Sequence, residues 1–156
     1  MDRELAECLG RASELIFLCS GNMVRSAFAE LYARHLDCPL PVRSAATIYR
    51  NDHLFPETLQ ALLARGVALE ELMRFRPTHL ADVVETLDAR TLALGMSRHH
   101  LGVLRSVRGW CGRSFLLAQA LGREEEIADP VLEGADFEHT FAAVARCVET
   151  IVARLR

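Results

Sequence analysis

The sequence predicts an α/β protein in which short parallel strands alternate with amphipathic helices. Its first apolar run, residues 15–18, is continuous, as is typical of a strand that is buried on both faces. Two further strand-like runs, 42–46 and 91–94, are separated from it and from each other by segments with helical spacing of apolar residues. This alternation predicts a doubly wound parallel sheet whose ligand site lies at the carboxyl ends of the strands.

Helical segments are recognised by apolar residues three or four positions apart. Residues 26–36 follow this pattern, Pro39 breaks it, and a second helix is predicted to begin at Pro56 and to end at Gly66. A short fourth strand is predicted to begin at Val107. The remaining predicted helices cover residues 78–88, 97–104, 114–121 and 136–155.

Length and charge limit the class of protein. With 156 residues, 51% of them hydrophobic, the chain is expected to form one domain with one core. Its 18 basic and 21 acidic side chains give a net charge of −3, which is no argument for binding nucleic acid or an anionic membrane. The first residues lack the segments of a signal peptide, and no apolar run reaches about 20 residues, the length that crosses a bilayer. We therefore predict a cytoplasmic protein.

The start of the chain is set apart by its pattern. Residues 1–13 are polar and helix-prone, with Leu5, Cys8 and Leu9 at helical spacing. We predict an N-terminal extension over 1–13 and a single domain over 14–156. Packing on the domain, self-association as a homodimer and fraying are all left open for this extension.

The cysteines give no sign of a disulfide framework or a metal site. Five cysteines are scattered along the chain without a C-x-x-C pair or a zinc-like cluster. The adjacent His99 and His100 would point in different directions on a helix and make a poor chelate. Reduced thiols, no metal and no cofactor are therefore expected.

The most informative feature is the C-x5-R-S pattern from Cys19 to Ser26, which joins the first strand to the next helix. A loop that bends around an anion points its backbone N–H groups inward, and the following helix N-terminus adds positive potential. This field stabilises a thiolate at Cys19. Arg25 offers a planar fork of donors that matches two phosphate oxygens, and Ser26 can donate a hydroxyl to the sulfur.

This loop, Cys19-Ser-Gly-Asn-Met-Val-Arg-Ser26, resembles the phosphate loop of the low-molecular-weight protein tyrosine phosphatase family. Further matches follow in the family's order along the chain, and together they cover about residues 14–155: 44–47, 91–96, the Asp-Pro pair at 129–130, and the closing helix at 137–155. The resemblance is to bacterial members more than to animal ones. It implies three α/β/α layers around a four-stranded parallel sheet in the order 2-1-3-4.

The resemblance also implies phosphomonoester hydrolysis through a cysteinyl-phosphate, most specifically on phosphotyrosine in proteins. Cys19 is then the nucleophile, Arg25 binds the phosphoryl oxygens and Asp129 is the general acid. Inorganic phosphate and other oxyanions are expected to act as inhibitors. The remaining loop residues would bind phosphate or support the loop, and in the family the motif serine bonds the loop asparagine; these residues are Ser20, Gly21, Asn22, Met23, Val24, Ser26 and Ser44.

Two positions of the loop depart from the family pattern in ways that matter. Val24 stands where many members carry a second cysteine that protects the nucleophile by a disulfide. Met23 stands where members discriminate substrates, a small threonine being associated with phosphoarginine and a bulkier apolar residue with phosphotyrosine. Met23 therefore favours phosphotyrosine on steric grounds.

The loop that follows the Asp-Pro pair at 129–130 also departs from the family pattern. Val131 and Leu132 replace the aromatic residues that usually flank the substrate ring. Tyr49, Phe55 and Trp110 are alternative candidates for a substrate wall. Residues 69–76 lack the family's histidine and arginine spacing, and these residues and the insert at 111–121 are candidates for a partner or dimer contact.

Three other functions stay open at this point. An arsenate reductase of the same fold would need two relay cysteines after the third strand, where residues 97–109 contain none and Cys111 is single. A phosphoarginine phosphatase would share the whole mechanism. A non-catalytic phospho-binding module would keep the pocket without turnover.

Overall fold

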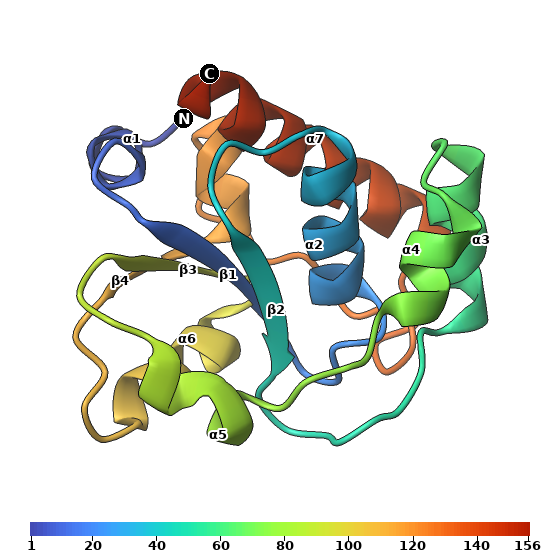
Figure 1. The fold of residues 1–156 in the computed structure, drawn as a ribbon, viewed down its shortest axis with the longest axis horizontal. Helices are drawn as coiled ribbons and strands as arrows, with labels where there is room; N and C mark the ends of the chain where they lie inside the picture. The colour runs from blue at the N-terminus through green and yellow to red at the C-terminus, as the bar shows by residue number, and fades with distance from the viewer.

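The central sheet has four parallel strands in the order β2-β1-β3-β4, which confirms the predicted topology. The computed structural model describes residues 1–156, and Figure 1 shows the sheet between two layers of helices. Parallel strands need crossover connections, and the helices between them supply these. The strands are β1 (Glu14–Cys19), β2 (Val42–Ala46), β3 (Thr91–Gly95) and β4 (Arg113–Leu116).

The register brings the carboxyl ends of the central strands together. Cys19 at the end of β1 lies opposite Ala46 at the end of β2. On the other side, Leu18 lies opposite Gly95, the last residue of β3. Side chains of β1 from Leu15 onward are buried, as a strand with neighbours on both edges and helices on both faces requires. Cys19 is therefore placed at the carboxyl edge of the sheet, beside the topological switch point between β1 and β3.

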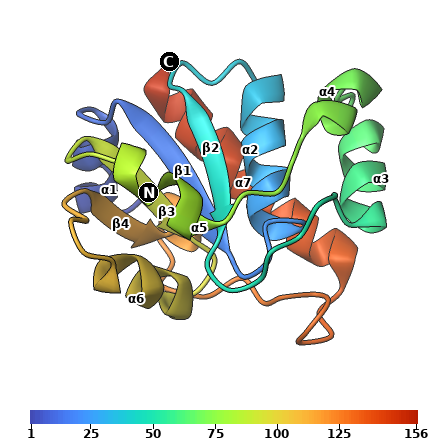
Figure 2. The same cartoon turned by 60° about the horizontal axis from the view of Figure 1, so that its bottom comes forward.

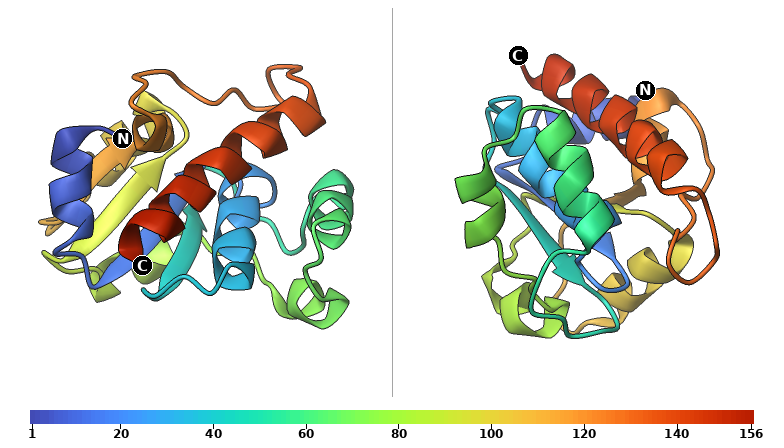
Figure 3. Two further views of the ribbon diagram at one scale, coloured as in Figure 1. Left: turned by 90° about the horizontal axis from the view of Figure 1, so that it is seen from above. Right: turned by 90° about the vertical axis from the view of Figure 1, so that its right-hand side faces the viewer.

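The larger layer packs on one face of the sheet around α2 (Arg25–His35) and α7 (Phe137–Leu155). Phe28 of α2 stacks on Phe141 of α7 with ring centroids 4.9 Å apart. Figure 3 shows α7 crossing over α2 on this side of the sheet. The other elements whose apolar residues join this layer are α1 (Arg3–Leu9), α3 (Pro56–Ala64), α4 (Leu69–Arg74) and the 3-10 helix η2 (Leu117–Leu121).

The smaller layer covers the opposite face with α5 (Leu80–Val83), the 3-10 turn η1 (Val84–Thr86) and α6 (Arg98–Ser106). Figure 2 shows α5 and α6 on this side. Leu80 and Leu104 pack here against the sheet residues Ile16 and Leu18. The helix predicted over 78–88 is therefore only partly present, as two short turns.

The fourth strand does not begin at Val107, as the sequence predicted. Val107 caps α6, and Gly109 turns the chain with a φ of 90°, so β4 begins only at Arg113. The helix predicted over 114–121 was wrong in its first half. Phe115 and Leu116 pair with Leu94 and Gly95 of β3, because ladder hydrogen bonds and burial outweigh a weak local helical preference.

The N-terminal segment forms a short helix against the larger layer. Asp2 caps α1 by accepting a hydrogen bond from the Leu5 backbone N–H, and Leu5 and Leu9 are fully buried. The division of the chain at residue 13 stays a prediction. None of the helices combines the length and apolar composition that crossing a membrane requires.

Candidate active site

The loop from Cys19 to Arg25 curls at the carboxyl edge of the sheet, between the end of β1 and the start of α2. Asn22 adopts a left-handed conformation with a φ of 53°, which asparagine tolerates better than most residues. This turn points the Asn22 backbone N–H at the Cys19 Sγ, 3.3 Å away. The loop therefore presents an amide donor to the sulfur, as a thiolate requires.

Ser26 donates the second hydrogen bond to the sulfur. Its Oγ lies 2.9 Å from the Cys19 Sγ and also accepts a hydrogen bond of 2.8 Å from the Asn22 Nδ2. Because the Asn22 amide occupies the acceptor side of this hydroxyl, its proton is free for the sulfur. Cys19 is only 2% exposed, so these donors act in a site from which most water is excluded.

Asn22 holds the loop to two other parts of the chain. Its Nδ2 donates to the Ser44 Oγ at 2.8 Å, which is the contact that the resemblance implied. Its Oδ1 accepts from the Thr78 backbone N–H, also at 2.8 Å. The strained turn is thus fixed from β2 and from the segment before α5, both far away in sequence.

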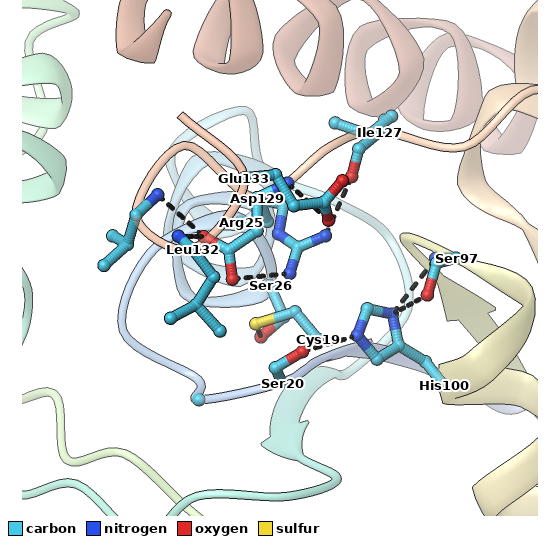
Figure 4. A network of polar contacts seen from close by, with 12 residues as sticks. Cys19, Ser20, Arg25, Ser26, Ser97, His100, Ile127, Asp129, Leu132 and Glu133 are labelled. Carbon is cyan, nitrogen blue, oxygen red and sulfur yellow. Dashed lines mark hydrogen bonds and ion pairs between the residues drawn. The ribbon is translucent and has the colours of Figure 1, made fainter. Parts of the chain in front are cut away.

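Arg25 and Asp129 form a buried ion pair at the mouth of the loop. The Arg25 Nη2 lies 3.2 Å from the Asp129 Oδ2, and its Nη1 donates to the Ile127 carbonyl at 2.8 Å. The other Asp129 oxygen accepts from the Val131 backbone N–H at 2.9 Å. Figure 4 shows the Asp129 carboxyl beside the Arg25 guanidinium, with Cys19 below the pair. The structure therefore brings the predicted acid to the predicted nucleophile loop.

A cavity of about 330 Å³ opens above the loop. Cys19, Arg25 and Asp129 lie at its base, and Tyr49, half exposed, forms part of its rim. Four further predicted site residues line the cavity with them: Ser20, Gly21, Met23 and Val24. Val131 and Leu132, which follow the Asp-Pro pair, line it as well. Arg50 and Asn51, which the sequence did not single out, complete the lining.

Trp110 and Phe55 do not reach this cavity, so neither forms its wall. Trp110 packs against the smaller layer, near Gly112, at the other side of the sheet. Phe55 stacks on Phe137 with ring centroids 5.6 Å apart and closes the core of the larger layer. Of the aromatic candidates, Tyr49 alone lines the cavity.

His100 is a site residue that the sequence reasoning missed. Its Nε2 lies 3.0 Å from the Ser20 Oγ, and the ring is only 1% exposed. Burial, together with the positive charges of Arg25 and His99, lowers the pKa of His100 to about 3. Adjacent histidines on a helix carry no local signal that one of them turns inward. Only the helical spacing with Leu104 places His100 near the buried face.

The other cysteines lie elsewhere. All five are free, and Cys8, Cys38, Cys111 and Cys147 are absent from the lining of the cavity. Burial raises the pKa of Cys147 to about 11, which keeps this thiol protonated and unreactive. No group of three or more histidine, cysteine, aspartate or glutamate side chains is placed to hold a metal ion.

A thiol held by amide and hydroxyl donors, beside a guanidinium and a carboxyl, defines a cysteine-dependent phosphatase site on this fold. Residues 14–156 match the family described as low molecular weight phosphotyrosine protein phosphatase. The chain is also 31% identical over 143 residues to the low molecular weight protein-tyrosine-phosphatase PtpB of Staphylococcus epidermidis, covering 88% of this chain and 96% of that protein. The chain belongs to this phosphatase family.

Solved structures share the fold. The tyrosine phosphatase Wzb from Escherichia coli K30, solved in complex with sulphate, has a TM-score of 0.75 at 20% identity, covering 93% of this chain and 99% of that one. The YwlE arginine phosphatase from Geobacillus stearothermophilus has a TM-score of 0.70 at 23% identity, covering 92% and 90%. At these identities the likeness concerns the fold alone.

Proposed function

We propose that this phosphatase hydrolyses phosphotyrosine in proteins, with Cys19 as nucleophile, Arg25 as the phosphate-binding cation and Asp129 as general acid. The observation that carries the proposal is the meeting of these three side chains at the base of one cavity. Asp129 comes from a loop 104 residues after Arg25, yet their side chains are 3.2 Å apart. A purely structural loop cysteine would not require this arrangement.

The reaction proceeds in two displacements. The Cys19 thiolate attacks phosphorus, the S–P bond forms, and the P–O bond to the leaving group breaks. Asp129, in its protonated form and released from the ion pair with Arg25, gives the leaving oxygen a proton. Arg25 and the loop N–H groups hold the three equatorial oxygens and stabilise their charge. Asp129, now a carboxylate, takes a proton from water as that water attacks phosphorus, and the S–P bond breaks to free the thiolate and phosphate.

The cavity supports an aromatic substrate. Met23 fills the part of the loop where a smaller residue would leave room for a different leaving group, and Tyr49 offers a ring on the rim. Val131 and Leu132, 45% and 62% exposed, add apolar area to the lining of the same cavity. A phenyl ring between such surfaces is favoured by burial of apolar area.

The proposal extends to ligands and setting. Inorganic phosphate and related oxyanions would occupy the loop and compete with substrate, since they match the same donors. A bacterial cytoplasm is the setting we propose, because the curated relative is bacterial and a reducing compartment would keep the five free cysteines reduced.

Steady-state hydrolysis of para-nitrophenyl phosphate, a phosphotyrosine peptide and phosphoarginine tests the proposal, with Cys19→Ser as control. We expect wild-type turnover that favours phosphotyrosine, and a Cys19→Ser variant that binds phosphate without turnover. Turnover by the variant near the wild-type rate would refute the covalent role of Cys19. No wild-type turnover on any substrate, with phosphate still bound, would instead support the phospho-binding or arsenate-reductase alternatives.

Phosphoarginine remains the second candidate, because the cavity lacks an aromatic side chain at residues 131 and 132. Met23→Thr separates the two substrates. If Met23 selects phosphotyrosine by its bulk, this variant shifts the ratio of kcat/KM toward phosphoarginine. A wild-type preference for phosphoarginine that Met23→Thr leaves unchanged would contradict the steric argument.

A further inference from the structure

Ser20 carries the one aliphatic hydroxyl in the lining of the phosphate cavity, and a buried histidine is hydrogen-bonded to it. The Ser20 Oγ lies 3.0 Å from the His100 Nε2, on helix α6, 80 residues away in sequence. Figure 4 shows the imidazole between Ser20 and Ser97, with Cys19 next to Ser20. None of the roles described so far uses this pair.

The direction of the hydrogen bond follows from the other side of the ring. The Ser97 backbone N–H donates to the His100 Nδ1 at 3.0 Å. A backbone N–H is always a donor, so Nδ1 must present a lone pair and cannot carry a proton. The proton of the neutral ring therefore lies on Nε2 and points to the Ser20 Oγ.

The surroundings keep the imidazole neutral. His100 is buried, and the positive charges of Arg25 and of His99 oppose a further proton, whereas Asp129 acts in the other direction. The pKa of His100 is lowered to about 3, so one tautomer persists over the whole range in which a phosphatase operates. The donor at Nε2 is thus permanent.

We propose that His100 is a positioning residue that makes the Ser20 hydroxyl an obligatory hydrogen-bond donor to the oxyanion bound above Cys19. The imidazole N–H occupies an acceptor lone pair of the Ser20 Oγ, so the hydroxyl proton must turn away from the ring. Ser20 lines the same cavity as Cys19 and Arg25, and that proton is then available to a phosphoryl oxygen. Ser20 joins the backbone amides and Arg25 as an oxyanion-binding residue. This inference rests on the proposed function.

Substitution of His100 would leave the Ser20 hydroxyl in place but free to rotate. Ser20 could then turn a lone pair toward the anion, which repels it, or rotate between states and lose part of its binding energy. A hydrogen bond to a charged group is worth enough to change binding by about tenfold. The effect of His100 must pass through Ser20, and this dependence separates positioning from a general structural role.

The experiment is a double-mutant cycle with Ser20→Ala, His100→Ala and both together, measured as kcat/KM for para-nitrophenyl phosphate. We expect each single variant to lose about tenfold and the double variant to lose no more than either. His99→Ala, an exposed neighbour on the same helix, is the matched control and should keep wild-type activity. Full additivity in the double variant, or an unchanged kcat/KM in Ser20→Ala, would overturn the proposal.

A second variant protects the test against misfolding. His100→Gln keeps a neutral side chain whose amide can donate to the Ser20 Oγ, and it should recover most of the activity that His100→Ala loses. Thermal unfolding of each variant monitors stability. If His100→Gln is as stable as the wild type but as inactive as His100→Ala, donation to Ser20 is not what His100 contributes, and the proposal fails.

Binding of tungstate, measured by calorimetry, decides the question without turnover. We expect Ser20→Ala and His100→Ala each to raise the tungstate Kd by about tenfold. Equal tungstate affinity in the wild type and both variants would refute the inference even if all of them hydrolyse substrate. Conversely, wild-type protein without turnover would refute the proposed function, while the tungstate comparison would still test the role of Ser20.

Discussion

The base and the rim of the phosphate cavity are built in different ways. In the loop that supports the base, Cys19, Asn22 and Ser26 are at most 2% exposed, and each is hydrogen-bonded to another. At the rim, Tyr49 and Leu132 are 49% and 62% exposed, and neither side chain has a hydrogen-bond partner or an aromatic partner. Side-chain hydrogen bonds therefore fix the residues at the base, whereas none fixes the side chains of Tyr49 and Leu132 at the rim.

This difference assigns the chemistry and the selectivity to separate parts of the molecule. A reaction common to all substrates needs fixed donors around sulfur and phosphate, and buried hydrogen-bond networks supply them. Recognition of the leaving group needs only apolar contact, which exposed loop side chains provide. The Asn51 Nδ2, which donates to the Gly21 carbonyl at 2.8 Å, ties the rim loop after β2 to the base.

The largest expected effect lies at the base, in Asp129→Asn. Without an acid, a poor leaving group such as phenolate must depart unprotonated, and we expect kcat for phenyl phosphate to fall by about 10²- to 10³-fold. Para-nitrophenolate, a good leaving group, should lose much less. Comparison of kcat for the two esters checks this, and an equal loss for both would remove Asp129 as the acid.

Asn22 should be the residue on which the structure of the base depends most. Asn22→Ala leaves the Thr78 N–H without its acceptor and removes the donor to Ser26 and Ser44, so we expect the free energy of unfolding to fall by about 2–4 kcal/mol. Asn22→Gly loses the same contacts but adopts the left-handed turn freely. In urea unfolding, the free energy of unfolding of Asn22→Gly should therefore exceed that of Asn22→Ala by about 1 kcal/mol.

The reverse order of these two variants would show that the left-handed turn is not strained. Loss of activity in both, with wild-type stability, would mean that Asn22 acts only on the sulfur and not on the loop as a whole.

Glu30 on α2 offers a pH-dependent test on the buried side. It is 6% exposed, and burial, only partly offset by Arg34, raises its pKa from 4.5 to about 7. The protonated carboxyl therefore favours the folded state, and this contribution is complete below pH 4.5 and is lost as the pH rises through about 7. Glu30→Gln is neutral at every pH. Its free energy of unfolding should therefore increase relative to that of the wild type as the pH rises from 5 to 8.

Chemical unfolding of both proteins at a series of pH values measures this difference. Parallel stability curves for the wild type and Glu30→Gln would contradict the raised pKa.

The smallest effect is expected at the rim. Tyr49→Ala removes apolar area beside the leaving group but touches no reacting atom, so KM for a phosphotyrosine peptide should rise about three- to tenfold with kcat nearly unchanged. Leu69→Ala, an equally exposed apolar residue on α4, should change neither constant. A fall in kcat at constant KM would instead show that Tyr49 contributes to the chemical step, as the residues at the base do.

How much the sequence could predict depended on whether a feature is local. Cys19 and Arg25 lie at the two ends of one loop within a continuous strand-loop-helix segment. Their spacing therefore predicted the loop and its anion-binding geometry. The continuous apolar run at 15–18 and the strand-like runs at 42–46 and 91–94 likewise predicted β1, β2 and β3 at nearly their observed bounds. In each case the signal and the structure lie within the same few residues.

The features that sequence reasoning placed wrongly depend on partners far along the chain. Residues 113–116 form a strand because the edge of β3 offers ladder hydrogen bonds, and no local pattern shows that edge. Trp110 packs against the apolar residues of the smaller layer, away from the cavity whose wall it was a candidate to form.

The sequence by itself thus determined the α/β order of elements, the phosphate loop and the type of nucleophile, because these arise from local backbone geometry and from residues within one segment. Only the tertiary structure decided that Asp129 meets Arg25, that Asn22 is held by Ser44 and Thr78, and that His100 turns toward Ser20. These contacts join residues separated by 22 to 104 positions. Their physical reason is the parallel sheet, which gathers loops from distant segments at one carboxyl edge.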